Sequence, residues 1–283
     1  MDALQRSQNR AALPQLRKLN VWAFGLHAAL AVALTVVFAA RWDSDKFGFP
    51  VYHSTLEDKE GDGGGDRGAM GYTPRLDEWF KIYVPVLIIL FPAITACFHL
   101  YYRLDPQGLY ERGVARGSQR LRWIEYAITA TLMIVAVSIM SGLNTAPALL
   151  AIIGLNIALM LQGTNVEEEL ARFGRVTHVA RSSTFVGWLA AIILIVLVVT
   201  QFSKSISDSK NLGSDVPSWV YFVIIPSVLF YTSFGAVQLA QVMRPRTPYR
   251  KFEWWYMVLS FVSKAFLAIW VAIGLLQQTN DED

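Results

Sequence analysis

The stretch WWYMVLSFVSKAFLAIW, residues 254–270, places one charged side chain, Lys264, in the middle of an apolar segment. Together with the apolar residues that follow, it is long enough to cross a bilayer as a helix, which takes about 20 residues. A charged amine at the bilayer centre costs roughly 2.5 to 3.5 kcal/mol even on the insertion scale that penalises it least. We therefore expect Lys264 either to be neutralised by a partner or to be used in chemistry.

Similar apolar segments recur along the whole chain. Of its 283 residues, 54% are hydrophobic and 17% are charged, whereas soluble domains carry about 25% charged residues. Seven runs have the length and composition of a membrane span, namely residues 21–40, 79–102, 123–143, 146–161, 184–202, 219–242 and 254–276. The sequence therefore predicts an all-α membrane protein, a bundle of seven transmembrane helices that forms a single domain over residues 1–283.

The charges that flank these runs alternate from one loop to the next. Arginine and lysine gather in residues 1–19, in the loop after the second run and in the loop after the sixth. The first loop, residues 41–78, is net acidic, and residues 281–283 are all acidic. Because basic flanks stay in the cytoplasm, we expect a cytoplasmic N-terminus and an external C-terminus. The basic start leads directly into a full span, so no cleaved signal peptide is expected.

The loop of residues 41–78 is the only sizeable segment outside the seven runs. Residues 47–52, Phe-Gly-Phe-Pro-Val-Tyr, have the aromatic and β-branched content of a strand. They predict a small β-hairpin outside the membrane, with a disordered loop as the alternative. Residues 61–66 form a glycine-rich tract of low complexity, which is typical of a flexible linker.

Few ionisable side chains lie well inside the seven runs. They are His27, His99, Glu125 and Lys264. Each is a functional candidate, because ionisable groups at membrane depth are costly and rare. Glu125 is the only carboxylate expected to meet Lys264. The two reach the same depth if the third helix begins near Arg116, which would draw Arg120 and Arg122 partly into the bundle.

The pair of Lys264 and Glu125 has two interpretations. It is either a buried ion pair that fixes the register of two helices, or a Schiff base with its counterion. An amine in apolar surroundings condenses with carbonyl compounds, and a nearby carboxylate favours the protonated imine. His27 and His99 either bond to backbone carbonyls or line a polar cavity with Glu125 and take part in proton transfer. No carboxylate follows Glu125 in its span, and the outer halves of the other spans contain no aspartate, glutamate or histidine, so vectorial proton pumping is not expected.

The arrangement resembles a known family. Seven helices with a lysine in the last and a glutamate in the third resemble the microbial rhodopsins. The expected inverted orientation and the segments RWIEY, residues 122–126, and SFVSK, residues 260–264, resemble the heliorhodopsins in particular. The resemblance extends from about residue 15 to 277. Proton-pumping rhodopsins carry an aspartate four residues before the retinal lysine, where this chain has Ser260.

The resemblance implies a retinal site. It implies all-trans retinal on Lys264 as a protonated Schiff base, with Glu125 as the counterion. It also implies Ser260 beside the Schiff base, and His27 and His99 in a cavity on the cytoplasmic side. Further candidates for the retinal pocket are Asn156, Trp188, Phe230 and Tyr231. Ordinary core packing is the alternative for the aromatic residues, because large rings dominate any core.

The sequence therefore predicts a photoreceptor of the heliorhodopsin type. It would be a light sensor with a slow photocycle, not an ion pump and not an enzyme. The resemblance further implies a homodimer in membrane lipid and an unidentified signalling partner; no nucleic acid is expected. A light-gated proton or ion channel on the same scaffold is one alternative. A small-solute transporter is another, although the sequence lacks the pair of Gly/Pro-broken helices that transporters use. The single cysteine, Cys97, rules out an intrachain disulfide.

Overall fold

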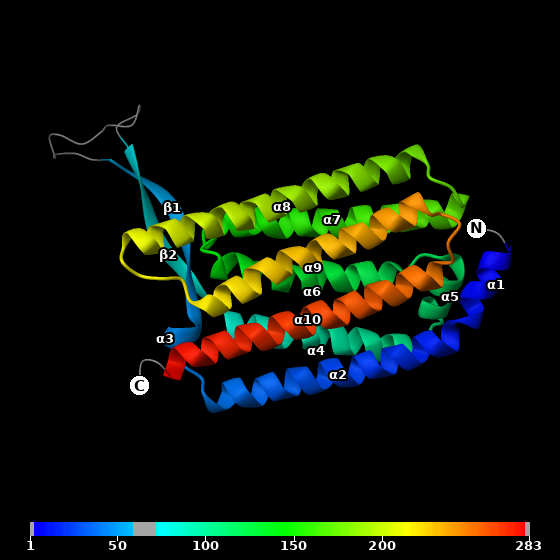
Figure 1. Ribbon diagram of the computed structural model, residues 1–283, viewed down its shortest axis with the longest axis horizontal. Helices are drawn as coiled ribbons and strands as arrows, with labels where there is room; N and C mark the ends of the chain where they lie inside the picture. The colour runs from blue at the N-terminus through cyan, green and yellow to red at the C-terminus, as the bar shows by residue number, and fades with distance from the viewer. Residues whose placement is uncertain (1–2, 59–71, 281–283) are drawn as a thin grey trace.

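The computed structural model describes residues 3–58 and 72–280, and within them the chain forms seven helices that are long and apolar enough to cross a membrane (Figure 1). These are α2 (Leu13–Ala40), α4 (Val84–Leu104), α6 (Arg120–Met140), α7 (Ala146–Phe173), α8 (His178–Asn211), α9 (Ser218–Met243) and α10 (Tyr249–Asn280). Shorter elements are α1 (Ala3–Ala11), α3 (Ser44–Phe47), α5 (Leu109–Arg116), β1 (Gly48–Asp58) and β2 (Tyr72–Tyr83). The predicted seven-helix membrane bundle with a small hairpin is confirmed. The glycine-rich tract 61–66 and the acidic residues 281–283 lie outside the described residues.

The long helices run side by side and give the bundle two distinct ends (Figure 1). Along the chain, α2 packs on α4, α4 on α6, α6 on α7 and α7 on α8, while α9 packs on α10. Helix α10 also contacts α2 and α4 and so closes the bundle. Helices α1 and α5 lie at one end, called here the N-terminal end. Helix α3 and the two strands lie at the opposite end, called here the hairpin end.

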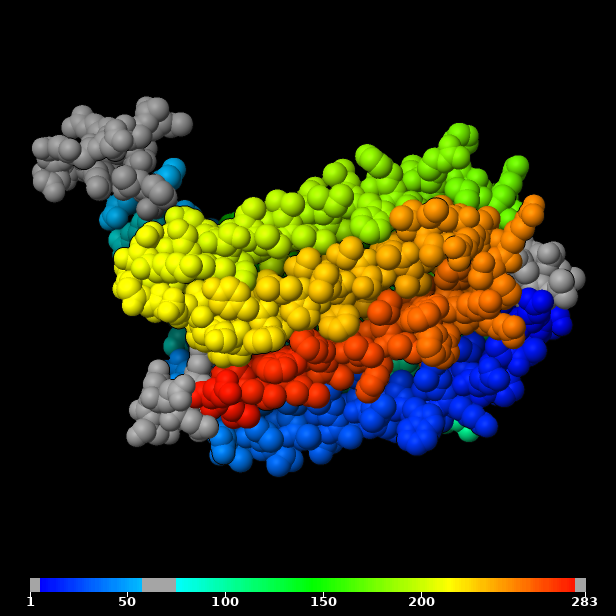
Figure 2. Space-filling view, viewed as in Figure 1, coloured from blue at the N-terminus to red at the C-terminus, as the bar shows by residue number. Residues whose placement is uncertain are grey.

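The outer surface of the bundle is apolar. Figure 2 shows the face formed by α2, α8, α9 and α10. On these helices, large apolar side chains such as Val32, Phe185 and Leu229 are exposed to 63%, 69% and 63%. Large exposed apolar surfaces are disfavoured in water but are the expected lining towards lipid tails. The chain is therefore an integral membrane protein that crosses the bilayer several times.

The hairpin corrects one predicted boundary. Strands β1 and β2 pair antiparallel from Gly48 opposite Tyr83 outwards, with a bulge between Val51 and Tyr52. The backbone N–H of Tyr52 donates to the carbonyl of Asn144 at 2.9 Å, which ties the hairpin to the start of α7. Residues 79–83 thus belong to β2, and the second span begins at residue 84 instead of 79. Aromatic residues in this segment suit a strand as well as a span, which explains the error.

The start of the third span also differs from the expectation. Helix α5 ends at Gly117, whose φ of 83° lies in the left-handed region that glycine adopts without strain. Helix α6 therefore begins at Arg120, and the expected start near Arg116 is wrong. Arg120 points outward and pairs with Glu168 on α7, whereas Arg122 is buried with 3% exposure. Only one of the two arginines is drawn into the bundle.

Helix α7 is longer than the predicted run of residues 146–161. It continues for three further turns to Phe173, so the acidic residues 167–169 are helical and do not form a loop. Glu167 faces inward and is fully buried, on the same face as Met160, Gly163 and Leu170. The helix ends at Phe173 and is capped by Gly174, which has a φ of 64°. The charges of residues 167–169 lie beyond the predicted run, but helical spacing places one of the three carboxyls inside the bundle.

The interior changes character between the two ends. At the hairpin end the buried side chains are aliphatic and aromatic, including Phe38, Phe47, Ile88, Phe91 and Leu275. At the N-terminal end tyrosines and a tryptophan share the interior with charged groups; this part contains Tyr102, Tyr110, Trp123, Tyr126, Tyr249, Tyr256, Arg122, Glu167 and Glu253. A buried charge needs hydrogen-bonding partners, so the N-terminal end is where chemistry is expected.

Candidate functional site

Lys264 and Glu125 meet in the middle of the bundle. The Nζ of Lys264 on α10 donates to Oε1 of Glu125 on α6 at 2.7 Å and to Oγ1 of Thr95 on α4 at 2.6 Å. The lysine side chain is 3% exposed and the glutamate side chain 2%. Removing one partner of such a pair would leave an uncompensated buried charge, which typically costs about 3–5 kcal/mol. The two groups therefore depend on each other in the fold.

The two predicted histidines lie together on the side of this pair that faces the N-terminal end. The rings of His27 on α2 and His99 on α4 stack with centroids 5.9 Å apart and an interplanar angle of 5°. Nδ1 of His99 lies 2.7 Å from Oδ1 of Asn20. Tyr102, whose ring stands edge-on to His99, donates to Oε2 of Glu125 at 3.3 Å. The structure thus brings His27, His99 and Glu125 into one polar group.

Both ring nitrogens of His27 are buried and have no hydrogen-bond partner among the described residues. The ring also packs edge-on to Phe261, which lies less than one turn before Lys264 on α10. Buried polar atoms normally find partners, and the usual partner of an orphaned one is an ordered water. The surroundings of His27 therefore fit a hydrated cavity better than the backbone bond that was the alternative interpretation.

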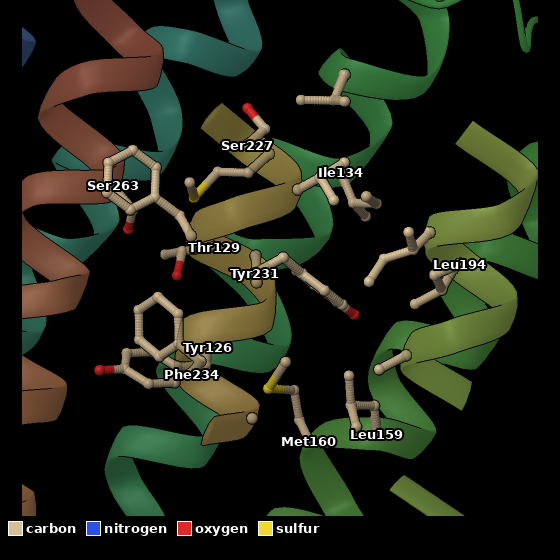
Figure 3. A pocket seen from close by; sticks show the side chains of 18 of the residues that line it. Tyr126, Thr129, Ile134, Leu159, Met160, Leu194, Ser227, Tyr231, Phe234 and Ser263 are labelled. Atoms are coloured by element: carbon tan, nitrogen blue, oxygen red, sulfur yellow. The ribbon is translucent and has the colours of Figure 1, made fainter. Parts of the chain in front are cut away.

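An apolar pocket adjoins Lys264 on the other side. It lies between α6, α7, α8, α9 and α10, and Figure 3 shows Tyr126 and Phe234 on one side of it and Leu194 on the other. Its lining includes the predicted residues Ser260, Trp188, Phe230 and Tyr231, and Lys264 itself. Asn156 is not part of the lining. It supports the wall instead, because it accepts a hydrogen bond from Tyr231 at 3.0 Å and donates to Thr131 at 2.9 Å.

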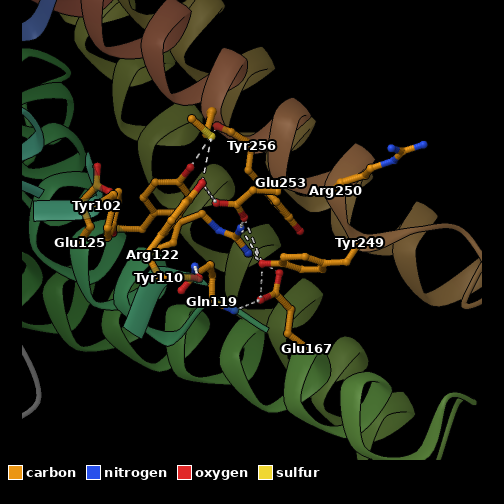
Figure 4. Close-up of polar contacts among 12 residues, drawn as sticks. Tyr102, Tyr110, Gln119, Arg122, Glu125, Glu167, Tyr249, Arg250, Glu253 and Tyr256 are labelled. Carbon is orange, nitrogen blue, oxygen red and sulfur yellow. Dashed lines mark hydrogen bonds and ion pairs between the residues drawn. The ribbon is translucent and has the colours of Figure 1, made fainter. Parts of the chain in front are cut away.

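A second charged group was missed from the sequence. Arg122 on α6 binds Glu167 on α7 and Glu253 on α10, and all three side chains are at most 3% exposed (Figure 4). The hydroxyl of Tyr249 lies among them, and the guanidinium packs 4.2 Å from the ring centre of Tyr256. We call Arg122, Glu167, Tyr249 and Glu253 the arginine cluster. It links three spans at the N-terminal end.

The sequence carries a signal for the arginine cluster just outside the predicted apolar runs. The predicted seventh run begins at residue 254, one position after Glu253, and the predicted fourth run ends at residue 161, before Glu167. In the structure Glu253 shares a helix face with Tyr249 and Tyr256, at spacings of four and three residues. That spacing marks one side of a helix. Following the apolar periodicity beyond the end of the hydrophobic run would have found both carboxyls.

These features define a class of protein. A membrane bundle of seven helices whose last helix carries a buried lysine, paired with a carboxylate beside an apolar pocket, has the architecture of a rhodopsin. The crystal structure of Exiguobacterium sibiricum rhodopsin superimposes with a TM-score of 0.64, over 94% of this chain and 98% of that chain, at 13% sequence identity. At this identity the likeness concerns the fold alone.

The sequence profile of the heliorhodopsin family matches residues 16–276. The chain therefore belongs to the heliorhodopsin family, and it is a retinal-binding rhodopsin. No curated protein sequence matches it.

The pocket fits the cofactor that the family implies. Retinal is an apolar polyene with one carbonyl carbon, and the pocket is lined mostly by aliphatic and aromatic side chains with a single amine, Lys264, among them. Close packing supports its shape: a Cβ atom added to Gly235 would lie 3.0 Å from the ring of Trp188. Lys264 would hold the cofactor, and Trp188, Phe230 and Tyr231 would enclose it.

Proposed function

We propose that this protein is a light sensor in which all-trans retinal is joined to Lys264 as a protonated Schiff base, with Glu125 as its counterion. Bound retinal supplies the conjugated chain that absorbs visible light and isomerises. The observation that carries this proposal is the contact of 2.7 Å between Nζ of Lys264 and Oε1 of Glu125, buried at the wall of an apolar pocket.

The neighbouring side chains have separate tasks in this proposal. Glu125 and Thr95 hold the nitrogen of Lys264 in place, and both accept hydrogen bonds from it. Tyr102 donates to the second carboxylate oxygen of Glu125 and so fixes its orientation. His27 and His99 lie beyond it and would receive the proton that leaves the nitrogen, because imidazole exchanges protons near neutral pH. Ser260, buried one turn before Lys264, would tune the polarity beside the nitrogen.

The distribution of titratable groups supports a sensor over a pump. In the described parts of the chain, the buried acids, histidines and arginine all lie level with Lys264 or on its N-terminal side. Buried polar side chains between Lys264 and the hairpin end, such as Ser138 and Ser141, do not titrate in the physiological range. A proton that left Lys264 would find no buried carboxylate or imidazole, among residues 3–58 and 72–280, to carry it towards the hairpin end.

The flanking charges support a cytoplasmic N-terminal end and an external hairpin, following the excess of arginine and lysine near α1, α5 and the α9–α10 connection. With this orientation the proton would stay in the cavity on the cytoplasmic side. The light-driven change in charge near Glu125 would alter how α6 and α10 pack. We propose that a partner protein or the surrounding lipid detects this change, and that the photocycle is slow because no transport step drives it forward. The homodimer implied by the resemblance stays a prediction.

Illumination of cells that express the protein with retinal distinguishes these functions. A sensor should give no lasting pH change in the medium and no steady photocurrent under voltage clamp. A pH change that persists in light and is abolished by a protonophore would contradict the proposal and indicate a pump. Steady photocurrents would contradict it in favour of the light-gated channel. A preparation that stays colourless with added retinal would favour the transporter.

A further inference from the structure

The arginine cluster contains more carboxyl groups than cations. Arg122 contacts both Glu167 and Glu253, and the three side chains are buried. The other buried ion pair, Lys264 and Glu125, is neutral as a whole. If both carboxyls of the cluster were ionised, the buried interior would carry one uncompensated negative charge. Proteins avoid this by binding a proton or another ion, because an unpaired charge in a low-dielectric interior is strongly unfavourable.

Counting hydrogens at Tyr249 leads to the same conclusion. Its hydroxyl oxygen lies 3.0 Å from Oε2 of Glu253 and 3.2 Å from Oε2 of Glu167, and it accepts a hydrogen bond from Nη1 of Arg122 at 2.9 Å. A phenol has one hydrogen to donate. It can serve only one of the two carboxyl oxygens, so the other contact is favourable only if that carboxyl carries a hydrogen of its own.

We propose that Glu167 and Glu253 share one exchangeable proton through the hydroxyl of Tyr249, which makes the arginine cluster a proton-binding site that is loaded in the dark. The proton resides mainly on Glu253. Glu167 is the better-satisfied carboxylate, because it also accepts from the backbone N–H of Gln119 at 3.1 Å. The first oxygen of Glu253 has only the hydroxyl of Tyr110, at 3.5 Å.

The groups that face the site fit this assignment. Tyr110 on α5 stays a hydrogen-bond donor, because burial raises its pKa well above the ordinary value. Its ring stacks on Tyr102 of α4 at 5.1 Å, and Tyr102 in turn donates to the counterion Glu125. Helix α9 contributes the neutral Gln241. Among the described residues, Arg122 is the cation that forms ion pairs with the two carboxyls, and Arg244 lines the pocket beside Tyr249. The proton site and the counterion are separated by one stacked pair of tyrosines.

A small pocket borders Tyr249 at the N-terminal end. Tyr249, Gln241 and Arg244 belong to its lining. The side-chain oxygen of Gln241 is buried and lacks a hydrogen-bond partner among the described residues, which is the usual mark of an ordered water. Water at this place would exchange the proton of the cluster with solvent. The orientation proposed above makes that solvent the cytoplasm; the proton site itself does not depend on it.

Infrared spectroscopy of the full-length protein labelled with 13C-glutamate tests the proposal. At neutral pH the wild type should show the carbonyl stretch of one neutral carboxylic acid, and this band should move to lower frequency in D2O because the proton exchanges. Glu253→Gln and Glu167→Gln should each lose the band, since one remaining carboxylate balances Arg122. The matched control is Glu168→Gln, which removes the exposed partner of Arg120 next to Glu167 and should keep the band.

Three results would overturn the proposal: no such band in the wild type, a band that survives in both cluster variants, or a band unaffected by D2O. Variants are compared only if their helical circular dichroism and elution match the wild type. The first and third results are measured on the wild type alone. The proposal can therefore be contradicted even if both variants misfold. The measurement also works on protein prepared without retinal. Failure of the Lys264 assignment would appear as a missing visible band and not as a missing infrared band.

Discussion

The buried side chains in the two halves of the bundle differ in chemical type. Between Lys264 and the N-terminal end, the interior holds a histidine pair, Glu125 and the arginine cluster, which are connected by contacts of Tyr102 and Tyr110. Between Lys264 and the hairpin end, it holds rings and aliphatic chains such as Phe38, Phe47 and Phe91. The half at the N-terminal end contains groups that can bind and transfer protons. The buried side chains of the half at the hairpin end serve mainly in packing. Lys264 lies at the boundary, and this asymmetry is why we infer sensing instead of transport.

Removing the side chain of Lys264 should have the largest effect on the visible absorption band. Lys264→Ala deletes the amine that would bind retinal, so the purified variant should lose its visible absorption band completely. Lys204→Ala is the matched control, because Lys204 on α8 is exposed and pairs only with Asp208 one turn later. Absorption spectra of both variants after incubation with retinal check this. A normal band in Lys264→Ala would end the assignment.

Removing the counterion should have the next largest effect. Glu125→Gln leaves the buried cation without its carboxylate, which typically costs about 3–5 kcal/mol of stability. Loss of the negative charge should also move the absorption maximum of the protonated form to longer wavelength. Thermal bleaching and the visible spectrum measure the two effects, with Glu168→Gln as the exposed control. An unchanged maximum would mean that another group serves as the counterion.

A substitution in the half of the bundle at the hairpin end should lower the stability of the protein without changing its absorption maximum. Phe47 is fully buried and packs edge-on to Phe38 and Trp42. Phe47→Ala should lower the free energy of unfolding by about 3 kcal/mol, the lower end of the range for such truncations, with no shift of the absorption maximum. Thermal bleaching and spectra of the same sample check both parts. A clear colour change would contradict the division between the halves.

The smallest expected effect concerns the wall of the pocket. Tyr231→Phe removes the hydroxyl that donates to Asn156 at 3.0 Å. A hydrogen bond of this kind contributes about 1 kcal/mol, so thermal bleaching should occur at a slightly lower temperature. The absorption maximum should shift by less than in Glu125→Gln, because a dipole is removed and not a charge. A shift as large as that of Glu125→Gln would contradict the expected ranking of the charge of Glu125 above the dipole of Tyr231.

Much of the fold followed from length and composition. Spans of about 20 apolar residues can be recognised in a sequence without any knowledge of packing. The hairpin could be predicted from the strand-like composition of residues 47–52. The errors lie where two patterns share the same residues. Trp79 and Phe80 suit a strand and a span equally well, and the end of α5 depends on the conformation of Gly117. Periodicity alone does not resolve such boundaries.

The site could be predicted only where a charge interrupts an apolar run. Lys264 and Glu125 stand out for that reason. Their contact is present, although the helix start near Arg116 on which the expectation of equal depth rested is wrong. Glu167 and Glu253 lie where spans leave the bilayer, and charged residues there are ordinarily exposed. Their burial depends on the lateral packing of α6, α7 and α10, with Arg122 between them. That packing is a property of three helices together, which no single segment encodes.

The central claim is that Lys264 carries the pigment. Retinal-loaded protein can be treated with borohydride, which reduces an imine to a stable amine, then digested and mapped by mass spectrometry. We predict one added retinyl group on the peptide that contains Lys264, and none on peptides that contain other lysines such as Lys204. A coloured protein whose retinyl group maps to another lysine, or to none, would contradict the account.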